Sequence, residues 1–196
     1  MIGELIKLRA EAKKSGEPIL RDASFELLIK TVKEHKPKSM LEIGVNLGLS
    51  GIAMLLSSEN SRLTGIEIDE EKVKLARQNY AKFGVDKRAR IILGDATEVI
   101  PVLTGKYDFI FLDGPKGHYG EYVSYLLPLL SVNGILFADN VLFRGYVTGK
   151  VKTPHRFATT KHGMEKYLKT VCEDKKLITE IYDIEDGVAV TEKLSD

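Results

Sequence analysis

Two short apolar runs of the sequence each end in side chains that carry oxygen. The run YDFIFLDG leads to Asp113, and the run GILFADN leads to Asp139 and Asn140. Apolar runs of this length that close on a polar residue are typical of buried parallel strands, and ligands of an open α/β sheet bind outside the carboxyl ends of such strands. Two carboxylates and one amide form a hard oxygen set that suits Mg²⁺, Mn²⁺ or Ca²⁺ better than zinc. The sequence therefore predicts a divalent-cation site, because two like charges held together are costly without a cation between them.

Lys116 lies three residues after Asp113, in the segment DGPKGHY. At this distance a lysine could reach a group held by the cation, and a neutral lysine can accept a proton. A solvated loop lysine is the ordinary alternative, since most lysines are exposed. Because Lys116 falls between an expected metal ligand and the next helix, it is our candidate general base.

Strand and helix patterns alternate along the chain, which is typical of a parallel sheet with helices on both faces. A closing pair of strands joined by Glu185-Asp186-Gly187 has the form of a hairpin and would add one antiparallel strand. No linker, repeat or low-complexity tract divides the chain, so a single domain is expected over residues 1–196. Strands are expected near 39–43, 62–67, 89–93, 107–112, 134–138, 177–184 and 187–192, and helices near 2–14, 22–35, 49–58, 70–83, 95–103, 119–130 and 160–173.

The composition bounds the class of protein. With 43% hydrophobic and 29% charged residues, the chain fits a soluble α/β domain with a full core, and its net charge of +1 gives no overall attraction to nucleic acid or membrane. The single cysteine, Cys172, excludes an internal disulfide and a multi-cysteine metal site, and it favours a reduced, cytoplasmic setting. No apolar run reaches the ~18 residues that a membrane span needs.

Two helices are expected in the N-terminal segment, residues 1–36. The first lacks the apolar core of a signal peptide. It is expected to carry Ile2, Leu5, Ile6 and Leu8 on one side.

The segment SMLEIGVNLGLS runs from the first strand into a helix and has the form of a nucleotide-binding turn. Gly44 and Gly48 bracket the turn, and glycine permits positive φ and a close approach of the backbone to a ligand. The following helix offers free N–H groups to an anion, and Ser50 adds a hydroxyl there. At the end of the second strand, Glu67 could bond a ribose diol. The alternatives are that the glycines merely allow a tight turn and that Glu67 is a solvated acid.

The third strand ends in ILGDA, which places Asp95 and Ala96 where an adenine edge could be read. The dinucleotide fingerprint G-x-G-x-x-G is absent, because the loop contains only Gly44 and Gly48. This argues against a pyrophosphate cradle and hence against NAD and a dehydrogenase. What remains is a nucleoside that carries a small carboxylate end, a description that S-adenosylmethionine fits.

Taken together, the segments LEIGVNLGLS, GIEID, GDA, FLDGPKGHY and ADNVLFRG resemble those of the cation-dependent class I O-methyltransferases. This family includes catechol O-methyltransferase and the caffeoyl-coenzyme A O-methyltransferases, and the resemblance runs from about Pro18 to Val190. It implies a Rossmann-like sheet of seven strands with the last one antiparallel, S-adenosylmethionine as methyl donor, and bound Mg²⁺ or a similar ion. Relatives are often homodimers, so a homodimer is implied as well.

The resemblance gives each candidate residue a role. Asp113, Asp139 and Asn140 match the metal ligands, Asp113 also counts among the residues around the donor, and Lys116 matches the general base. The stretch Val45-Asn46-Leu47 departs from the family pattern, because relatives often have Thr or Ala at its first position. This difference changes the detail of the loop but not the inferred identity of the donor. The implied donor-binding set is Leu20, in the looser match Pro18-Ile19-Leu20, with Glu42, Gly44, Gly48, Ser50, Glu67, Asp95 and Ala96.

A narrower resemblance concerns the acceptor. The segment DNVLFRG, the basic stretch after it and the ending IEDGVAVTEK look most like the bacterial tRNA 5-hydroxyuridine methyltransferases, which make 5-methoxyuridine at the wobble position. That acceptor offers adjacent O4 and O5 oxygens, so the chemistry of a catechol would apply unchanged. Two alternatives stay open, a small-molecule catechol or acyl-coenzyme A methyltransferase and, more remotely, a domain that binds nucleotide or RNA without turnover.

Residues 143–164 form a basic insertion without any acidic residue, beside the expected acceptor site. Its cations could contact phosphates, and Phe143, Tyr146 and Phe157 could stack on an unpaired base. A solvated loop whose aromatic residues anchor it to the fold or to a second subunit is the alternative. The residues expected to contact RNA are Arg144, Lys150, Lys152 and Arg156.

Overall fold

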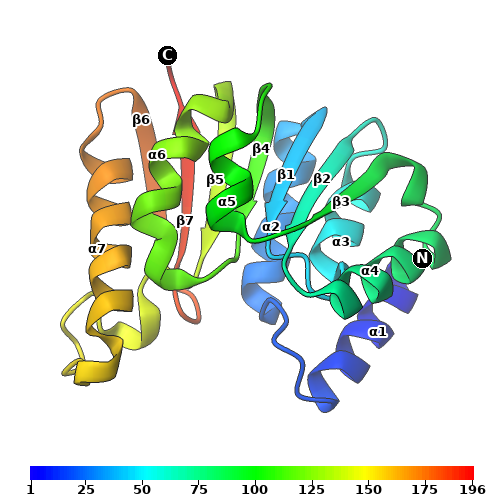
Figure 1. Ribbon diagram of the computed structural model, residues 1–196, viewed down its shortest axis with the longest axis horizontal. Helices are drawn as coiled ribbons and strands as arrows, with labels where there is room; N and C mark the ends of the chain where they lie inside the picture. Colours follow the sequence, from blue (N-terminus) through cyan, green and yellow to red (C-terminus); the bar gives the residue numbers. More distant parts are fainter. The chain divides into compact units, whose positions relative to one another are not determined.

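The structure is a computed structural model that describes residues 1–196, and it groups into two compact units, residues 1–95 and residues 96–196. Figure 1 shows the helices and strands of both units. A single domain over the whole chain stays a prediction. None of the helices combines the length and the apolar character that crossing a membrane requires.

The first unit is built on three parallel strands. Its elements are α1 (Ile2–Lys14), α2 (Asp22–His35), β1 (Ser39–Ile43), α3 (Leu49–Ser57), β2 (Arg62–Glu67), α4 (Glu70–Lys82), η1 (Asp86–Arg88) and β3 (Ala89–Leu93). The strand order is β3-β2-β1, and both pairings are parallel. Helix α3 packs against α1, α2 and α4, and α4 also packs on β2 and β3. Along the chain, strands and helices alternate, so that each strand is followed by a helix that packs back on the sheet.

The second unit contains the remaining strands. Its elements are α5 (Ala96–Val99), η2 (Ile100–Val102), β4 (Tyr107–Leu112), η3 (Lys116–His118), α6 (Tyr119–Leu129), β5 (Leu130–Asp139), η4 (Phe143–Gly145), η5 (His155–Phe157), α7 (Ala158–Glu173), β6 (Leu177–Tyr182) and β7 (Val188–Lys193). The strand order is β4-β5-β7-β6, in which β4 and β5 are parallel. Strand β7 is antiparallel to both of its neighbours, β5 and β6. Helices α6 and α7 pack side by side (Figure 1).

The predicted fold class is confirmed. The strands make a seven-stranded mixed sheet in which β7, the last strand, runs antiparallel, and helices pack around it. The turn expected at Glu185-Asp186-Gly187 lies between β6 and β7. This is the arrangement of Rossmann-like folds that carry an antiparallel strand on an otherwise parallel sheet.

Two predicted elements differ from the structure by more than two residues at one end. The helix expected over residues 95–103 is shorter, because α5 ends at Val99 and a 3₁₀ turn continues over Ile100–Val102. Pro101 lies inside this stretch and lacks the backbone N–H that an α-helix needs. The strand expected at 134–138 begins earlier, at Leu130, directly after α6.

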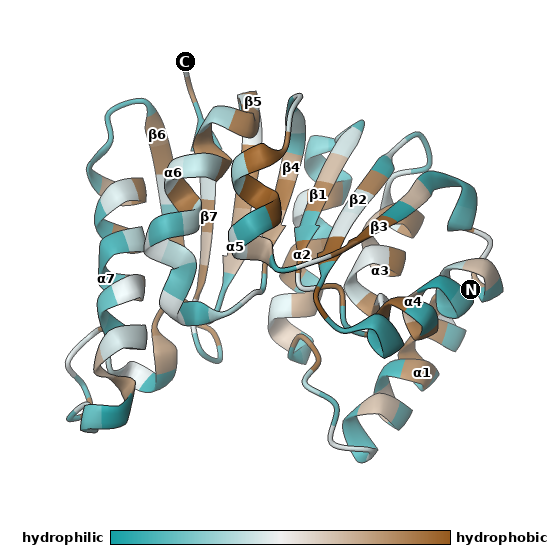
Figure 2. Ribbon diagram, in the orientation of Figure 1, coloured by the Kyte–Doolittle hydropathy of each residue, from teal (hydrophilic) through white to brown (hydrophobic).

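Aromatic packing fixes the register of β4 and β5. The ring centroids of Phe109 and Phe137 lie 6.3 Å apart, and those of Phe111 and Phe137 lie 5.7 Å apart. All three side chains are fully buried, and Figure 2 shows the apolar character of these strands. A slip of one residue would turn these rings to the opposite face, so the register at the ends of both strands is strongly specified.

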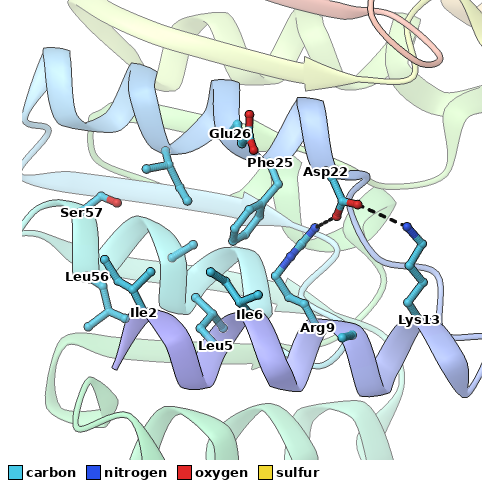
Figure 3. A pocket seen from close by; sticks show the side chains of 13 residues that line it. Ile2, Leu5, Ile6, Arg9, Lys13, Asp22, Phe25, Glu26, Leu56 and Ser57 are labelled. Atoms are coloured by element: carbon cyan, nitrogen blue, oxygen red, sulfur yellow. Dashed lines mark hydrogen bonds and ion pairs between the residues drawn. The ribbon is translucent and has the colours of Figure 1, made fainter.

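Helix α1 buries only part of its apolar side. Leu5 is buried, while Ile2 and Ile6 are each 58% exposed. They line a cavity of about 540 Å³ at α1, α2 and α3, which Figure 3 shows. The guanidinium of Arg9 lies 3.5 Å from the ring centroid of Phe25. A long cationic side chain thus covers part of the apolar surface of α2.

Candidate functional site

The carboxyl ends of β4 and β5 bring Asp113 and Asp139 to the same rim of the second unit. The two strands are parallel, and their last register pair is Leu112 with Ala138. Asp113 and Asp139 directly follow these residues, and neighbouring strands lie about 4.8 Å apart. Asp139 is only 3% exposed. Two of the three predicted metal ligands are therefore neighbours on adjacent strands.

Tyr119 is a buried residue close to both carboxylates. Its hydroxyl donates a hydrogen bond to the backbone oxygen of Leu112 at 2.9 Å. Burial raises the pKa of Tyr119 well above 10.0, and the negative charges of Asp113 and Asp139 raise it further. The phenol therefore stays a neutral donor that holds the end of β4, and the two carboxylates concentrate negative charge around it. Sequence reasoning did not find this residue.

Lys116 forms an ion pair with Asp113. Its Nζ lies 2.8 Å from Asp113 Oδ1, and the side chains of the two residues are 27% and 24% exposed. Lys116 opens the short turn η3, which packs against α7. A partly buried amine thus stands at the rim beside the carboxylates, and its role as general base stays a prediction.

Asn140 begins the loop that follows β5 and adopts a positive φ of 61°. The backbone beyond it is held by the turn between β6 and β7. Val141 N donates to Gly187 O at 3.0 Å, and Leu142 N donates to Asp186 O at 2.9 Å. The hairpin therefore fixes the loop that carries the third predicted metal ligand.

The oxygen groups on this rim fit a hard divalent cation. Nowhere in the structure do three or more His, Cys, Asp or Glu side chains gather in a way that could hold a metal ion. The predicted set contains two carboxylates, and its third oxygen would come from the Asn140 amide, a ligand type that Mg²⁺, Mn²⁺ and Ca²⁺ accept. The positions of Asp113 and Asp139 agree with such a site, and metal binding stays a prediction.

Replacing Gly187 with alanine is expected to destabilise the loop that carries Asn140. Gly187 has a φ of 83°, and an added Cβ would lie 2.2 Å from Leu142 Cγ. We expect the free energy of unfolding, measured by urea denaturation, to fall by about 2 kcal/mol. Gly149→Ala is the matched control, because Gly149 has a φ of 72° and an added Cβ there meets nothing within 4 Å. Equal losses in the two variants would show that the contact with Leu142 is unimportant.

The loop between β1 and α3, here called the donor loop (residues 44–48), has the backbone conformation expected of a nucleotide-binding turn. Gly44 has a φ of 90° and Gly48 a φ of 75°, values that favour glycine. Helix α3 begins directly after Gly48, and no side chain caps its N-terminus. Its first N–H groups are therefore available to an anion such as a carboxylate.

Glu67 lies at the end of β2, in register with Leu93 at the end of β3. Its Oε2 accepts a hydrogen bond from Asn46 N at 2.8 Å. Its Oε1 accepts from the backbone N–H groups of Ile68 and Asp69 at 2.9 and 3.0 Å. These bonds hold the carboxylate at the rim, and because an ionised carboxylate offers about four acceptor sites, it can still bind ribose hydroxyls.

Glu42 is fully buried at the end of β1, beside the first turn of α3. Ser50 Oγ donates a hydrogen bond to Glu42 Oε1. Burial and then the charge of Glu42 raise the pKa of Tyr80 well above 10.0. A Cβ added at Gly51 would lie 2.5 Å from the Tyr80 hydroxyl, so this position requires glycine, which sequence reasoning missed. The predicted contacts of Glu42 and Ser50 with the donor stay predictions.

Residues 17–20, here called the strap, connect α1 to α2 beside the donor loop. Leu20 is buried at 6% exposure. Three contacts hold the strap: Lys72 Nζ lies 2.6 Å from Glu17 Oε2, Asn46 Nδ2 donates to Pro18 O at 2.8 Å, and Arg9 Nη2 donates to Leu20 O at 2.8 Å. Sequence reasoning placed the strap at the donor but missed the residues that fix it. A signal existed for Arg9, which lies between Leu5 and Ala12 on the buried side of α1.

Asp95 is the final residue of the first unit and Ala96 begins α5 in the second. Asp95 follows β3 by two residues, and Gly94 N donates to Glu67 O at 2.9 Å. Within the first unit, the carboxyl ends of β2 and β3 therefore meet as predicted. Contact of Asp95 and Ala96 with an adenine ring stays a prediction.

The aromatic residues of the basic insertion contact one another. The ring centroids of Phe143, Tyr146 and Phe157 lie 5.5 to 5.6 Å apart in all three pairs, and Tyr146 is only 9% exposed. This favours the alternative in which the aromatic residues anchor the insertion. The cations stay exposed: Arg144 and Arg156 lie over the Phe157 ring, Lys150 pairs with Asp183 at 3.0 Å, and Lys152 is exposed.

Comparisons with known proteins agree with this arrangement. The model of the O-methyltransferase family matches residues 4–194. A caffeoyl-CoA O-methyltransferase from Stellaria longipes is 34% identical over 129 residues, which cover 62% of this chain and 54% of that protein. A Staphylococcus aureus structure provisionally named as a caffeoyl-CoA O-methyltransferase has a TM-score of 0.86 at 28% identity, covering 96% of this chain and 91% of that one. The SAH-bound methyltransferase PaMTH1 from Podospora anserina has a TM-score of 0.78 at 27% identity, with coverages of 89% and 80%.

Proposed function

Because the chain belongs to the O-methyltransferase family and is an S-adenosylmethionine-dependent enzyme, we propose that it methylates a hydroxyl that has a second oxygen on the adjacent atom, with the help of a divalent cation. The observation that carries the proposal is that Asp113 and Asp139 directly follow Leu112 and Ala138, the last register pair of β4 and β5. Two carboxylates there would hold a cation to which two neighbouring oxygens of an acceptor can bind.

The donor-binding groups of the proposal are those of the first unit. Glu67 would bond the ribose, and the open N-terminus of α3 with Ser50 would bond the carboxylate end. Support comes from the positive φ angles of Gly44 and Gly48 and from the SAH-bound relative at 27% identity. Glu42, Leu20, Asp95 and Ala96 complete the proposed donor site.

When bound, the divalent cation would lower the pKa of the acceptor hydroxyl, and S-adenosylmethionine would supply the methyl group. Asp113, Asp139 and the Asn140 amide would hold the cation. Once it has lost its own proton, Lys116 Nζ would accept the proton that the hydroxyl loses, and its contact with Asp113 Oδ1 keeps the amine at the rim. The deprotonated oxygen would then receive that methyl group, and S-adenosylhomocysteine would be released.

We further propose 5-hydroxyuridine in tRNA as the acceptor. Its O4 and O5 are adjacent oxygens, and the exposed cations of the basic insertion could contact the phosphates around the anticodon. A small phenolic or acyl-coenzyme A acceptor is the second candidate, and similarity to the Stellaria longipes caffeoyl-CoA O-methyltransferase favours it.

Mass spectrometry of tRNA nucleosides from cells that lack the protein separates the two acceptors. The proposal predicts that 5-methoxyuridine disappears and 5-hydroxyuridine accumulates. Unchanged levels of both nucleosides would contradict the tRNA acceptor and leave the small-molecule acceptor as the better account.

Charge reversal in the basic insertion should weaken methylation of tRNA but not of a small catechol. The double variant Lys152→Glu and Arg156→Glu replaces two exposed cations, and we expect kcat/KM for tRNA to fall at least about tenfold while the value for the catechol stays unchanged. The pair Lys169→Glu and Lys175→Glu, also exposed, is the control for net charge. Equal losses on both acceptors would refute docking of RNA at the insertion.

A further inference from the structure

Asn46 connects Glu67, the residue proposed to bind the ribose, to the strap. Its backbone N–H donates to Glu67 Oε2 at 2.8 Å, and its side-chain Nδ2 donates to Pro18 O at 2.8 Å. The other polar atom of its side chain, Oδ1, is buried and has no hydrogen-bond partner. Buried polar atoms in native proteins are almost always satisfied, so an exception in a ligand-binding loop indicates a group that the ligand completes.

The backbone at this position makes the choice of asparagine informative. Asn46 has a φ of 48°, in the left-handed region that glycine adopts with the least strain. Glycine would keep the N–H bond to Glu67, because that bond comes from the backbone. What asparagine adds is the amide side chain, with one group on Pro18 and the other without a partner.

We propose that Asn46 Oδ1 accepts a hydrogen bond from a ribose hydroxyl of bound S-adenosylmethionine, and that the same side chain thereby ties the strap to the donor. This inference rests on the proposed function. A ribose has two hydroxyl donors, and Glu67 already receives three N–H groups on its two oxygens. Sharing the ribose between Glu67 and Asn46 gives each hydroxyl an acceptor and gives Oδ1 the donor that it lacks.

The other contacts of the strap explain why Asn46 is the residue that responds to the ligand. Lys72 reaches Glu17 from α4, and Arg9 reaches Leu20 from α1, so both hold the strap from helices. Asn46 reaches Pro18 from the donor loop itself. A donor that forms a hydrogen bond with Asn46 Oδ1 would hold the amide in place, and the amide in turn holds the strap through Pro18. Bound donor should therefore slow the opening of residues 17–20.

The test compares Asn46→Gly with the unchanged enzyme, using S-adenosylhomocysteine and its 2′-deoxy and 3′-deoxyribose analogues in titration calorimetry. Glycine keeps the backbone N–H and tolerates the positive φ, so only the side-chain contacts are lost. We expect binding of S-adenosylhomocysteine to weaken about tenfold. In the unchanged enzyme, we expect one deoxy analogue to bind more weakly than S-adenosylhomocysteine. In Asn46→Gly, we expect that analogue and S-adenosylhomocysteine to bind with equal affinity.

A second readout follows the strap by hydrogen exchange of peptides that span residues 15–22. S-adenosylhomocysteine should slow exchange there in the unchanged enzyme and have no such effect in Asn46→Gly. Glu17→Gln, which removes the contact with Lys72, should speed exchange in the strap but keep the discrimination between hydroxyl and deoxy ligands. Asn133→Gly is the matched control, because Asn133 is exposed with a φ of 63°.

The outcomes separate the inference from the proposed function. If the unchanged enzyme fails to bind S-adenosylhomocysteine, the proposed function falls and the inference falls with it. If it binds and Asn46→Gly binds equally tightly, only the inference is overturned. If Asn46→Gly loses affinity but still discriminates the deoxy analogues as before, Asn46 merely supports the loop, and the inference is also overturned.

Discussion

Replacing Asp139 with alanine is expected to lower the rate of methyl transfer by roughly a thousandfold, which corresponds to about 4 kcal/mol of transition-state stabilisation. The variant loses one of the two carboxylates that lie on adjacent strands at the rim. The remaining oxygen groups, Asp113 and Asn140, are too few to hold a cation firmly. The assay follows release of S-adenosylhomocysteine with a catechol acceptor and added Mg²⁺.

Donor binding should survive this change, because the proposed donor contacts come from residues such as Glu67, Ser50 and the donor loop and not from Asp139. The dissociation constant for S-adenosylhomocysteine, measured by titration calorimetry, is expected to stay within about twofold. Asp139→Asn tests the same idea with the side-chain volume kept, and the exposed Asp174→Asn is the control. An Asp139→Ala enzyme that retains full activity would remove the metal role from this residue.

Replacing Lys116 with alanine is the second change with a large expected effect. If Lys116 is the general base, we expect turnover to fall by about a thousandfold. Steady-state rates between pH 6 and pH 10 provide the measurement, with kcat and KM determined separately. KM for the donor should change little, since the proposal gives the Lys116 amine no contact with the donor.

Lys116→Arg distinguishes a base from a fixed positive charge. Arginine preserves the charge beside Asp113, but it does not give up its proton at these pH values. We expect no recovery of activity in Lys116→Arg, and we expect the exposed Lys169→Ala to behave like the unchanged enzyme. Recovery by arginine would show that Lys116 acts through charge and not through proton transfer.

The strands and the rim were predictable because their signals are local. The apolar runs before Asp113 and Asp139 define buried strands, and the polar residues that close them must lie at the carboxyl ends. The register that places these residues side by side follows from burial of the aromatic residues on β4 and β5. Glu67 was predictable in the same way from the end of β2.

Other features were not predictable because they depend on contacts between distant segments. Nothing local indicates that Asn46 bonds Pro18, 28 residues away, or that Lys72 pairs with Glu17, 55 residues away. Nor does hydrophobic periodicity describe how Arg9 packs on Phe25.

The aromatic residues of the basic insertion show a different limit. Their types are equally suited to stacking on a base and to packing on one another, and the sequence left both possibilities open. The contacts of Phe143, Tyr146 and Phe157 favour anchoring, while the exposed cations remain available to a polyanion. Residue type alone could not decide between these uses.

The dependence of methyl transfer on a divalent cation tests the central claim most directly. Enzyme stripped with a chelator and dialysed is mixed with S-adenosylmethionine and a catechol, and product is measured before and after addition of Mg²⁺ or Mn²⁺. The account predicts no methylated catechol until the ion is added, and no response to the ion in Asp139→Ala. Full activity of the stripped enzyme would contradict it.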